Sequence, residues 1–301
     1  MEKYKVMNWN IAQATNKNGT NRIADLVIET IVEHNPDLLV LTEFCDCKNS
    51  ELFLEQLSQK GYDRYTKKEI YPKNNRQNKV LLAWKREQFS PAGEAPVHSY
   101  TNWTNNIPNF ARMTLESKLG SRLTLAGVRI TMGSKIESPK GAGGKSLEQQ
   151  YQEQATLRKK QMEYVMEELS DCEKVILTGD FNNYRRGTTC IDWNIGKLNC
   201  GDETYRVFTP QGQSIHGENA GSREYEFPED HFLAKGCSVE NYVYNRDFVK
   251  RCPQIYTEGK DFCTTKLVDD KLEKDWCVPV GIGFPDHAVL LGELIIGNEE
   301  V

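Results

Sequence analysis

Short apolar runs, most of them ending at a polar residue, recur along the chain and predict strands. Two of them, Asp37–Thr42 (DLLVLT) and Lys174–Thr178, are continuously apolar or nearly so, which is typical of a strand buried on both faces. The predicted strands are Lys3–Asn8, Asp37–Thr42, Lys79–Trp84, Phe110–Leu115, Leu123–Ile130, Lys174–Thr178, Asp230–Ala234, Val239–Tyr244 and Ala288–Ile296.

Three further segments indicate helices. Asn21–His34 repeats apolar residues with helical spacing and is stopped by Asn35-Pro36, while Ser50–Gln59 is broken by Gly61. Leu147–Leu169 is longer and more polar. Its candidate buried positions are Leu157, Met162, Val165 and Met166, and the LRKK run of residues 157–160 is expected on the exposed face.

Between these elements lie segments without a clear period. Met132–Ser146 is rich in Gly, Ser and Lys and predicts a loop, Cys190–Glu229 is irregular, and Arg246–Gly283 is a long excursion. We find no repeat and no clean linker, so we expect residues 1–301 to form a single domain. The order of the elements is mixed, which favours an α+β or layered fold with two sheets and helices outside.

Composition and charge exclude few classes of function. The formal net charge is −5, so bulk charge gives no argument for nucleic-acid binding and does not exclude it. No signal peptide and no stretch near 20 apolar residues is evident, so we expect a cytoplasmic protein with no membrane partner. The nine cysteines are then expected to be free thiols, with a zinc site as the lesser alternative.

The predicted chemistry lies where strands begin or end at acidic, amide or histidine side chains. Such residues at the ends of buried strands are where open sheets build binding sites. Gathered carboxylates repel one another unless a cation lies among them, and hard oxygen ligands favour magnesium, manganese or calcium. The residues in question are Asn8, Asn10, Glu43, Asp180, Asn182, Asp230, Asp286 and His287.

Five short motifs carry a resemblance to a known family. They are WNI at Trp9–Ile11, TE at Thr42–Glu43, GDFN at Gly179–Asn182, DH at Asp230–His231 and PDH at Pro285–His287. In this order the motifs resemble the endonuclease/exonuclease/phosphatase family. The resemblance implies an α/β (α+β) four-layer sandwich of two packed mixed β-sheets flanked by helices. It also implies a phosphodiesterase that uses Mg²⁺, with Mn²⁺ as a possible substitute.

The resemblance assigns the functional roles of the family's site residues to the matching residues of this chain. The resemblance implies that Glu43 binds the metal with Asn10 beside it, and that Asp286 lies close to the metal. Asp180 would position or deprotonate the attacking water. Asn182 would orient that aspartate and the phosphate.

A histidine and an aspartate complete the implied site. His287 would contact the scissile phosphate and Asp230 would pair with that histidine. A carboxylate beside an imidazole favours the protonated ring, which can stabilise negative charge on phosphate oxygens. We therefore expect a hydrogen bond between the two side chains, and removal of one such group should cost roughly 10²–10⁴ in rate.

Arg129 departs from the family pattern. Many nucleases of the family carry a histidine at this strand end, and apurinic endonucleases a tyrosine. An arginine can clamp a phosphate through two hydrogen bonds but cannot donate a proton at neutral pH. We therefore predict substrate binding by Arg129, together with Asn182 and His287; the alternative is a salt bridge within the sheet.

At two positions of the implied site, either of two nearby polar residues could be the site residue. Asp230 is favoured over His231 as the site residue, with His231 structural, and Asn10 is favoured over Asn8.

Two further segments could bind phosphate or nucleic acid. Gly141–Ser146 looks like a phosphate-binding loop, but Pro139 stands where that motif needs glycine, so we predict an ordinary loop. The basic segment Lys67–Arg86 could track a nucleic-acid backbone or form a solvated hairpin.

The sequence thus predicts a metal-dependent nuclease, with DNA as the favoured substrate. The alternative is a phosphatase or phosphodiesterase that acts on a small molecule, a nucleotide or a lipid headgroup. DNA or RNA as substrate, endonucleolytic or exonucleolytic cutting, and the oligomeric state are left open by the residues.

Overall fold

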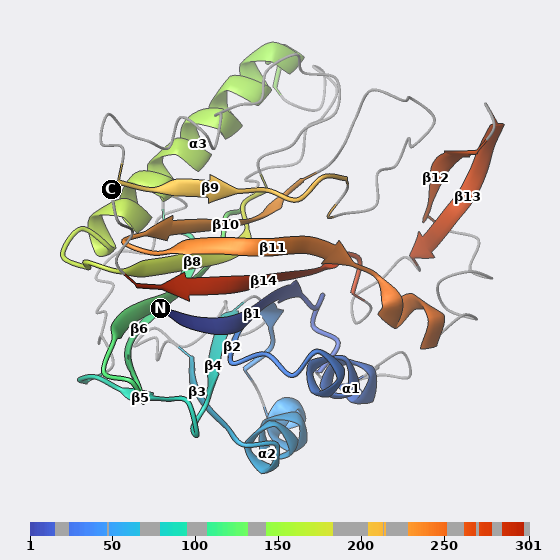
Figure 1. Ribbon diagram of the computed structural model, residues 1–301. Coiled ribbons are helices and arrows are strands. Elements are labelled where there is room, and N and C mark those ends of the chain that lie inside the picture. Colours follow the sequence, from blue (N-terminus) through green and yellow to red (C-terminus); the bar gives the residue numbers. More distant parts are fainter. Residues whose placement is uncertain are drawn as a thin grey trace.

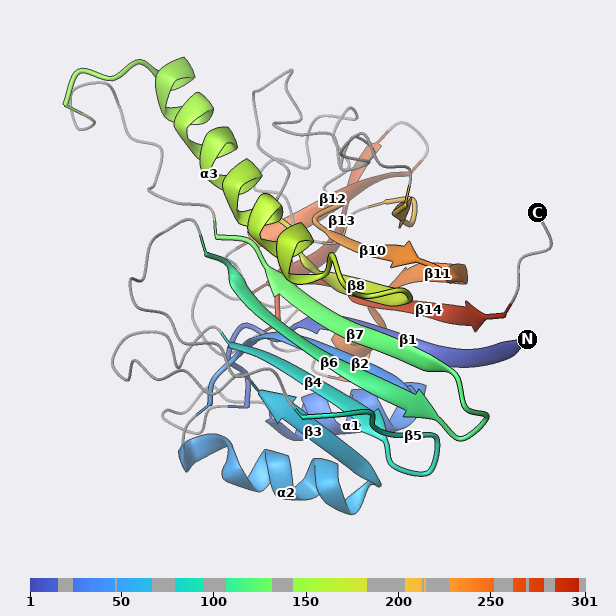
Figure 2. The same ribbon diagram turned by 90° about the vertical axis from the view of Figure 1, so that its left-hand side faces the viewer.

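The computed structural model describes most of the chain in several stretches. These are residues 1–15, 24–46, 48–66, 79–94, 107–131, 143–182, 204–212, 214, 228–251, 262–268, 271–278 and 285–297. Two six-stranded sheets pack face to face in these residues, and helices cover both outer faces (Figures 1 and 2). The fold is therefore the four-layer sandwich of two mixed sheets that the sequence predicts.

The first sheet is built around the N-terminal strand. In spatial order its strands are β11 (Ser238–Asn245), β14 (Val289–Ile296), β1 (Glu2–Asn10), β2 (Leu38–Phe44), β4 (Lys79–Lys85) and β3 (Tyr62–Thr66). The β1–β2 pair is parallel, and β14 runs antiparallel to β1. The polar end of β1 therefore lies beside the end of β2 and the start of β14.

The second sheet has the same number of strands. In spatial order they are β5 (Phe89–Pro91), β6 (Asn109–Ser117), β7 (Arg122–Arg129), β8 (Val175–Asp180), β10 (Asp230–Lys235) and β9 (Arg206–Phe208). Here β7 and β8 are parallel, and β10 runs antiparallel to β8. The ends of β7 and β8 thus meet the start of β10 at one edge of the sandwich.

The helices lie on the outer faces of the two sheets. In Figure 2, α1 (Ala24–His34) and α2 (Glu51–Gln59) cover the first sheet, whereas α3 (Leu147–Glu168) covers the second. Ser146 caps α3, because its hydroxyl accepts from the backbone of Gln149 while the Gln149 side chain accepts from the backbone of Ser146. Two short 3₁₀ helices, Lys48–Ser50 and Asp247–Arg251, and a separate hairpin of β12 (Phe262–Val268) and β13 (Lys271–Val278) complete the described elements.

Three hydrophobic clusters separate the four layers. Residues such as Val6, Leu125 and Phe232 fill the space between the sheets. The remaining two clusters lie between each sheet and its helices. The sheets approach closely at Gly127, where a Cβ would lie 2.5 Å from Cγ1 of Val80, so a larger residue would push the layers apart.

Most predicted elements are confirmed within a few residues at each end. The sequence does not predict strands β3, β5 and β9 or the β12–β13 hairpin, and β9 and the hairpin lie in segments that show no clear period. The prediction that residues 157–160 are exposed is wrong for Arg158, which is fully buried because helical spacing puts it on one face with Gln154 and Gln161. Leu157 and Met166 are only partly buried.

The described residues include several of the cysteines and part of the basic and glycine-rich segments. Cys45, Cys172 and Cys237 are buried free thiols, as expected. Residues 67–78 of the basic segment and Gly141 and Ala142 of the glycine-rich run lie outside the described residues.

Candidate active site

Strand alternation brings three polar side chains of the second sheet to the space between the sheets. Residues Leu123 and Leu125 of β7 face the first sheet, so Arg129, at the same parity, faces it too. The same rule places Asp180 at the end of β8 and Asp230 at the start of β10 on this inner face. The backbone register sets Asp180 directly opposite Arg129 on one side and Asp230 on the other.

The first sheet contributes Asn8 and Asn10, which share the inner face of β1 with Tyr4 and Val6. Both asparagines are almost completely buried. The Asn10 Nδ2 atom lies 3.1 Å from Oδ2 of Asp180 and 3.4 Å from Nε2 of His287. The Asn10 Oδ1 atom accepts from the backbone N–H of Ala12, which fixes the orientation of the amide.

Glu43 reaches the inner face through a break in the alternation of β2. Leu39, Leu41 and Phe44 all pack toward the helices, so one residue is added between Leu41 and Phe44 relative to β4. This extra residue is a β-bulge, and Glu43 adopts a positive φ of 53° there. The bulge turns the carboxylate of Glu43 away from the helices and toward Arg129.

Asp180 is held by amides on both sides. Its Oδ2 accepts from Nδ2 of Asn182 at 2.9 Å in addition to Asn10, and its Oδ1 accepts from the Asn182 backbone N–H at 2.9 Å. Asn182 has a positive φ of 44° and also donates to the carbonyl of Ile130. Gly179 precedes Asp180 with φ 154°, and a Cβ there would lie 1.8 Å from the carbonyl oxygen of Val128.

His287 and Asp230 form the predicted hydrogen bond. Nδ1 of His287 lies 2.7 Å from Oδ2 of Asp230, and both side chains are buried. Oδ1 of Asp230 accepts from Nδ2 of Asn8 at 3.0 Å. The indole N–H of Trp9 donates to the carbonyl of His287, so consecutive residues of β1 hold both members of the pair.

Arg129 pairs with the carboxylate of Glu43. Nη2 and Nε of Arg129 lie 2.7 and 2.9 Å from the same oxygen, Oε1. Nε is also 3.8 Å from Oδ2 of Asp180, so the guanidinium bridges two carboxylates. The contact with Asp180 lies within the second sheet, as in the alternative that the sequence offered, whereas the shorter pair with Glu43 joins the two sheets.

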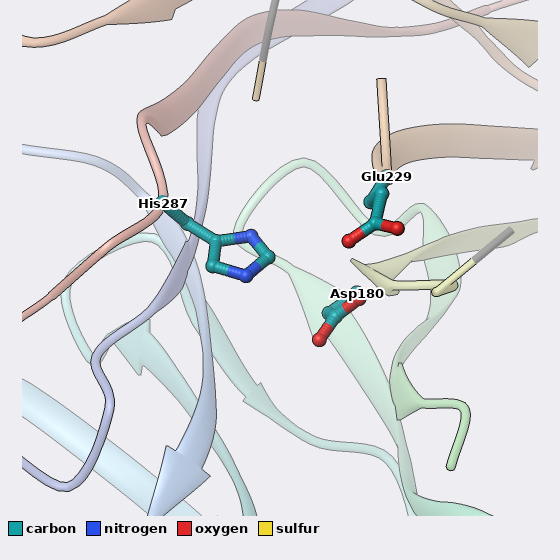
Figure 3. Close-up of side chains that lie close together, drawn as sticks. All are labelled: Asp180, Glu229 and His287. Atoms are coloured by element: carbon teal, nitrogen blue, oxygen red, sulfur yellow. The ribbon is translucent and has the colours of Figure 1, made fainter. Parts of the chain in front are cut away.

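Glu229 is a site residue that sequence reasoning missed. Its carboxylate lies with that of Asp180 and the imidazole of His287 in a group whose ligand atoms are all within 4.8 Å of one another (Figure 3). Glu229 is buried, and its backbone carbonyl accepts from the N–H of Phe181. The only available signal was its place next to Asp230.

His231 points to the other side of its sheet, because it alternates with Asp230 along β10. Its Nδ1 lies 2.8 Å from the hydroxyl of Thr209, and its ring packs edge-on against Phe181. Burial lowers the pKa of His231 to about 4, against the opposing effect of the Asp230 carboxylate. The geometry therefore agrees with the choice of Asp230 rather than His231 as the residue that faces the site.

The charges in the site shift the acid–base properties of its members. Burial raises the pKa of Asp180 to about 6; Asp230 adds to this rise, while His287 and Arg129 oppose it. Burial alone would lower the pKa of His287, but Asp230 and Asp180 raise it well above its usual range. The neighbouring carboxylates therefore favour the protonated imidazole, with Nδ1–H donating to Asp230.

The structure thus brings the predicted residues together at one end of the sandwich. Asp286 is partly exposed and lies near enough to help raise the pKa of both Arg129 and His287. The acidic and histidine group of Figure 3 overlaps the predicted catalytic residues. Of the predicted metal set, Asn10 lies 3.4 Å from Glu43 and also contacts Asp180 and His287 of that group.

Two packed mixed sheets with acid, amide and histidine side chains at one end define a hydrolase-type site in a four-layer sandwich. The family model described as "Endonuclease/Exonuclease/phosphatase family" matches residues 7–246, and the chain belongs to this family. Its members hydrolyse phosphoric esters and depend on divalent metal ions. No curated protein sequence matches the chain.

Solved structures share the fold at low sequence identity. The catalytic domain of human Nocturnin with bound sulfate is 16% identical, with a TM-score of 0.57 and coverage of 98% of this chain and 94% of that one. TDP2 from D. rerio with a single-strand DNA product is 12% identical, with a TM-score of 0.57 and coverage of 98% and 99%. A mannosyl-6-phosphatase from Bacteroides thetaiotaomicron is 13% identical, with a TM-score of 0.54 and coverage of 97% and 99%.

In the part of the chain that the structure describes, every helix is too short or too polar to span a lipid bilayer.

Proposed function

We propose that the protein is a divalent-metal-dependent phosphodiesterase that cleaves DNA. One observation carries this proposal: the amide of Asn10 lies against both Asp180 and His287, at 3.1 and 3.4 Å. A carboxylate that can accept a proton and an imidazolium that can stabilise an anion therefore share one small polar space. Hydrolysis of a phosphodiester requires both kinds of group.

Asp180 is suited to the role of base. With a pKa of about 6 it is ionised at neutral pH and still basic enough to take a proton from water. Asn182 donates to both of its oxygens and so fixes the direction of the free lone pairs. As the water oxygen bonds to phosphorus, its proton passes to Asp180, and the leaving oxygen departs with the electrons of the broken bond and takes a proton from solvent.

His287 is suited to hold the phosphate. Asp230 accepts the Nδ1–H, so Nε2–H is left to face the site beside Asn10. The positive charge of the ring stabilises the negative charge that develops on the non-bridging oxygens. Arg129 supplies a second cation and, because it cannot donate a proton at neutral pH, we assign it to phosphate binding.

The residues present fit a divalent cation. Oε2 of Glu43 makes no hydrogen bond or ion pair within the described residues, and it lies on a carboxylate adjacent to Asp180 and Asn10. Carboxylate and amide oxygens are the ligands that magnesium and manganese prefer. Glu43 and Asn10, with Asp286 nearby, would hold the ion. When bound, it would supply further charge stabilisation to the phosphate.

DNA is the substrate we favour, and TDP2 with its DNA product supports this choice by fold alone. The alternative is a phosphatase or phosphodiesterase for a small molecule, a nucleotide or a lipid headgroup. The mannosyl-6-phosphatase, which has the same fold, supports that alternative equally. The two differ in the substrate they need, so a direct comparison of substrates decides between them.

The test is a panel assay in buffer with Mg²⁺. Supercoiled plasmid, single-stranded DNA, RNA, nucleotides, sugar phosphates and inositol phosphates are each incubated with the wild-type protein and with Asp180→Asn. We expect cleavage of a DNA substrate by the wild type only. Turnover confined to phosphomonoesters would reject DNA in favour of the alternative, and equal turnover by both proteins would reject the site.

A further inference from the structure

The position of Arg129 has a consequence for how the site takes up its cation. The guanidinium places two nitrogens on Oε1 of Glu43 and keeps a third contact, at 3.8 Å, with Oδ2 of Asp180. It therefore fills the interval between the two carboxylates. A divalent cation held by Glu43 would have to share this carboxylate with the guanidinium.

The ion pair is well shielded from water. The side chains of Arg129 and Glu43 are 16% and 20% exposed, and that of Asp180 is 2% exposed. Charges in such a setting interact more strongly than on the surface, since solvent screens them less. The guanidinium and a divalent ion on the same carboxylate would repel one another, so Glu43 cannot hold both cations at low cost.

We propose that Arg129 acts as a gate that couples cation binding to phosphate binding. Without a phosphate, Arg129 neutralises Glu43 and weakens its affinity for the divalent ion. A phosphate offers the guanidinium a new partner with two matching oxygens, so Arg129 leaves Glu43 and the ion binds there. This inference rests on the proposed function, because it takes Glu43 as the metal ligand and a phosphate group as part of the substrate.

The coupling is reciprocal by thermodynamic necessity. If phosphate strengthens binding of the cation, the cation strengthens binding of phosphate by the same factor. Typical coupling between two sites is about 5–150-fold. In this scheme the protein binds its divalent ion tightly only when substrate is present, and the free protein binds divalent ions weakly.

The test measures Mn²⁺ binding directly and does not depend on turnover. The dissociation constant is obtained from the electron paramagnetic resonance signal of free Mn²⁺, with and without inorganic phosphate. Buffer with phosphate alone corrects for direct association of the two ions. Wild type is compared with Arg129→Met, which keeps a side chain of similar length but removes the charge.

We expect phosphate to tighten Mn²⁺ binding to wild type by about tenfold. We expect Arg129→Met to bind Mn²⁺ about tenfold more tightly than wild type without phosphate, and phosphate to add little. Arg112→Met is the matched control, since Arg112 is 19% exposed and pairs with Asp171 at 2.9 Å. This control should bind Mn²⁺ as wild type does.

Two results would overturn the gate. In one, Arg129→Met binds Mn²⁺ no more tightly than wild type; in the other, phosphate acts equally on both proteins. If Arg129→Met does not fold, Arg129→Gln takes its place, and an absence of any phosphate effect in wild type already refutes the coupling.

Glu43→Gln separates failure of the gate from failure of the proposed function. If Glu43→Gln leaves Mn²⁺ binding intact, Glu43 is not the metal ligand, and the proposed gate is wrong as well. If Glu43→Gln abolishes binding while Arg129→Met changes nothing, only the gate is wrong.

Discussion

The imidazole of His287 donates from Nδ1 to Oδ2 of Asp230 across 2.7 Å, although the two residues are 57 positions apart in the chain. Both side chains are buried between the sheets, so water does not compete for this hydrogen bond. The second carboxylate oxygen of Asp230 is occupied by Asn8. The orientation of the histidine is therefore set by residues that themselves have little freedom to move.

The first prediction is that Asp230 and His287 act as one unit. His287→Ala and Asp230→Ala should each lower kcat by roughly 10²–10⁴, because either change removes the charged imidazole from its place at the phosphate. The double variant should be little worse than the worse single variant. Steady-state kinetics of the four proteins tests this, and losses that multiply would show independent roles.

The second prediction concerns Asn8 as a positioning residue. Asn8→Leu keeps a similar volume but removes the donor to Asp230, so kcat should fall about 10–100-fold with little change in KM. In an Asp230→Asn background the same change should have little further effect. Thr42→Val, at a buried position of the neighbouring strand, is the matched control and should leave kcat near that of the wild type. If Asn8→Leu is as active as Thr42→Val, Asn8 does not help to position Asp230.

The third prediction concerns stability in acid. The buried His231 has its pKa lowered to about 4, whereas in the unfolded chain it titrates near 6.5. The unfolded state therefore binds the proton first, and stability present above pH 6.5 is lost as the pH falls toward 4, by about 3 kcal/mol in total. Denaturant unfolding of wild type and His231→Gln at pH 7 and pH 4 tests this. The free energy of unfolding should fall less in the variant, and parallel declines would contradict the assignment.

The fourth prediction concerns the backbone that carries Asp180. Gly179→Ala places a Cβ 1.8 Å from the carbonyl oxygen of Val128, so the parallel pairing of β7 and β8 must distort. We expect a loss of about 3 kcal/mol or more in the free energy of unfolding. Gly93→Ala is the control, because Gly93 also has a positive φ but its Cβ would meet nothing within 4 Å. Equal effects of the two changes would mean that the clash is not what matters.

The inner position of Asp180, Asp230 and Arg129 could be predicted from sequence. Each alternates in step with the apolar residues that face the opposite sheet, and each is the first or last residue of a strand whose pattern is clear. The family motifs added the pairing of Asp230 with His287. Strand patterns alone could not give that pairing, since it joins a strand of one sheet to the segment that leads into a strand of the other.

The rest of the site could not be predicted because it depends on irregular backbone. By simple alternation Glu43 would face the helices, and only the bulge after Leu41 turns it inward. Glu229 precedes its strand, so alternation says nothing about where its side chain points. The charged run around Arg158 predicts an exposed side chain. Helical geometry instead places Arg158 on the buried face of α3 with Gln154 and Gln161, whatever its charge.

In the proposed reaction, Asp180 acts together with a divalent ion in hydrolysing a phosphodiester at this end of the sandwich. The most direct measurement is the rate of hydrolysis of bis(p-nitrophenyl) phosphate by wild type and Asp180→Asn, with Mg²⁺ and with the ion removed by a chelator. The melting temperature of both proteins is recorded alongside. We expect activity only for wild type with Mg²⁺, and we expect Asp180→Asn to melt as wild type does yet lose activity by about 10²-fold or more. Near-native turnover by a folded Asp180→Asn protein, or full activity of wild type without the ion, would contradict it.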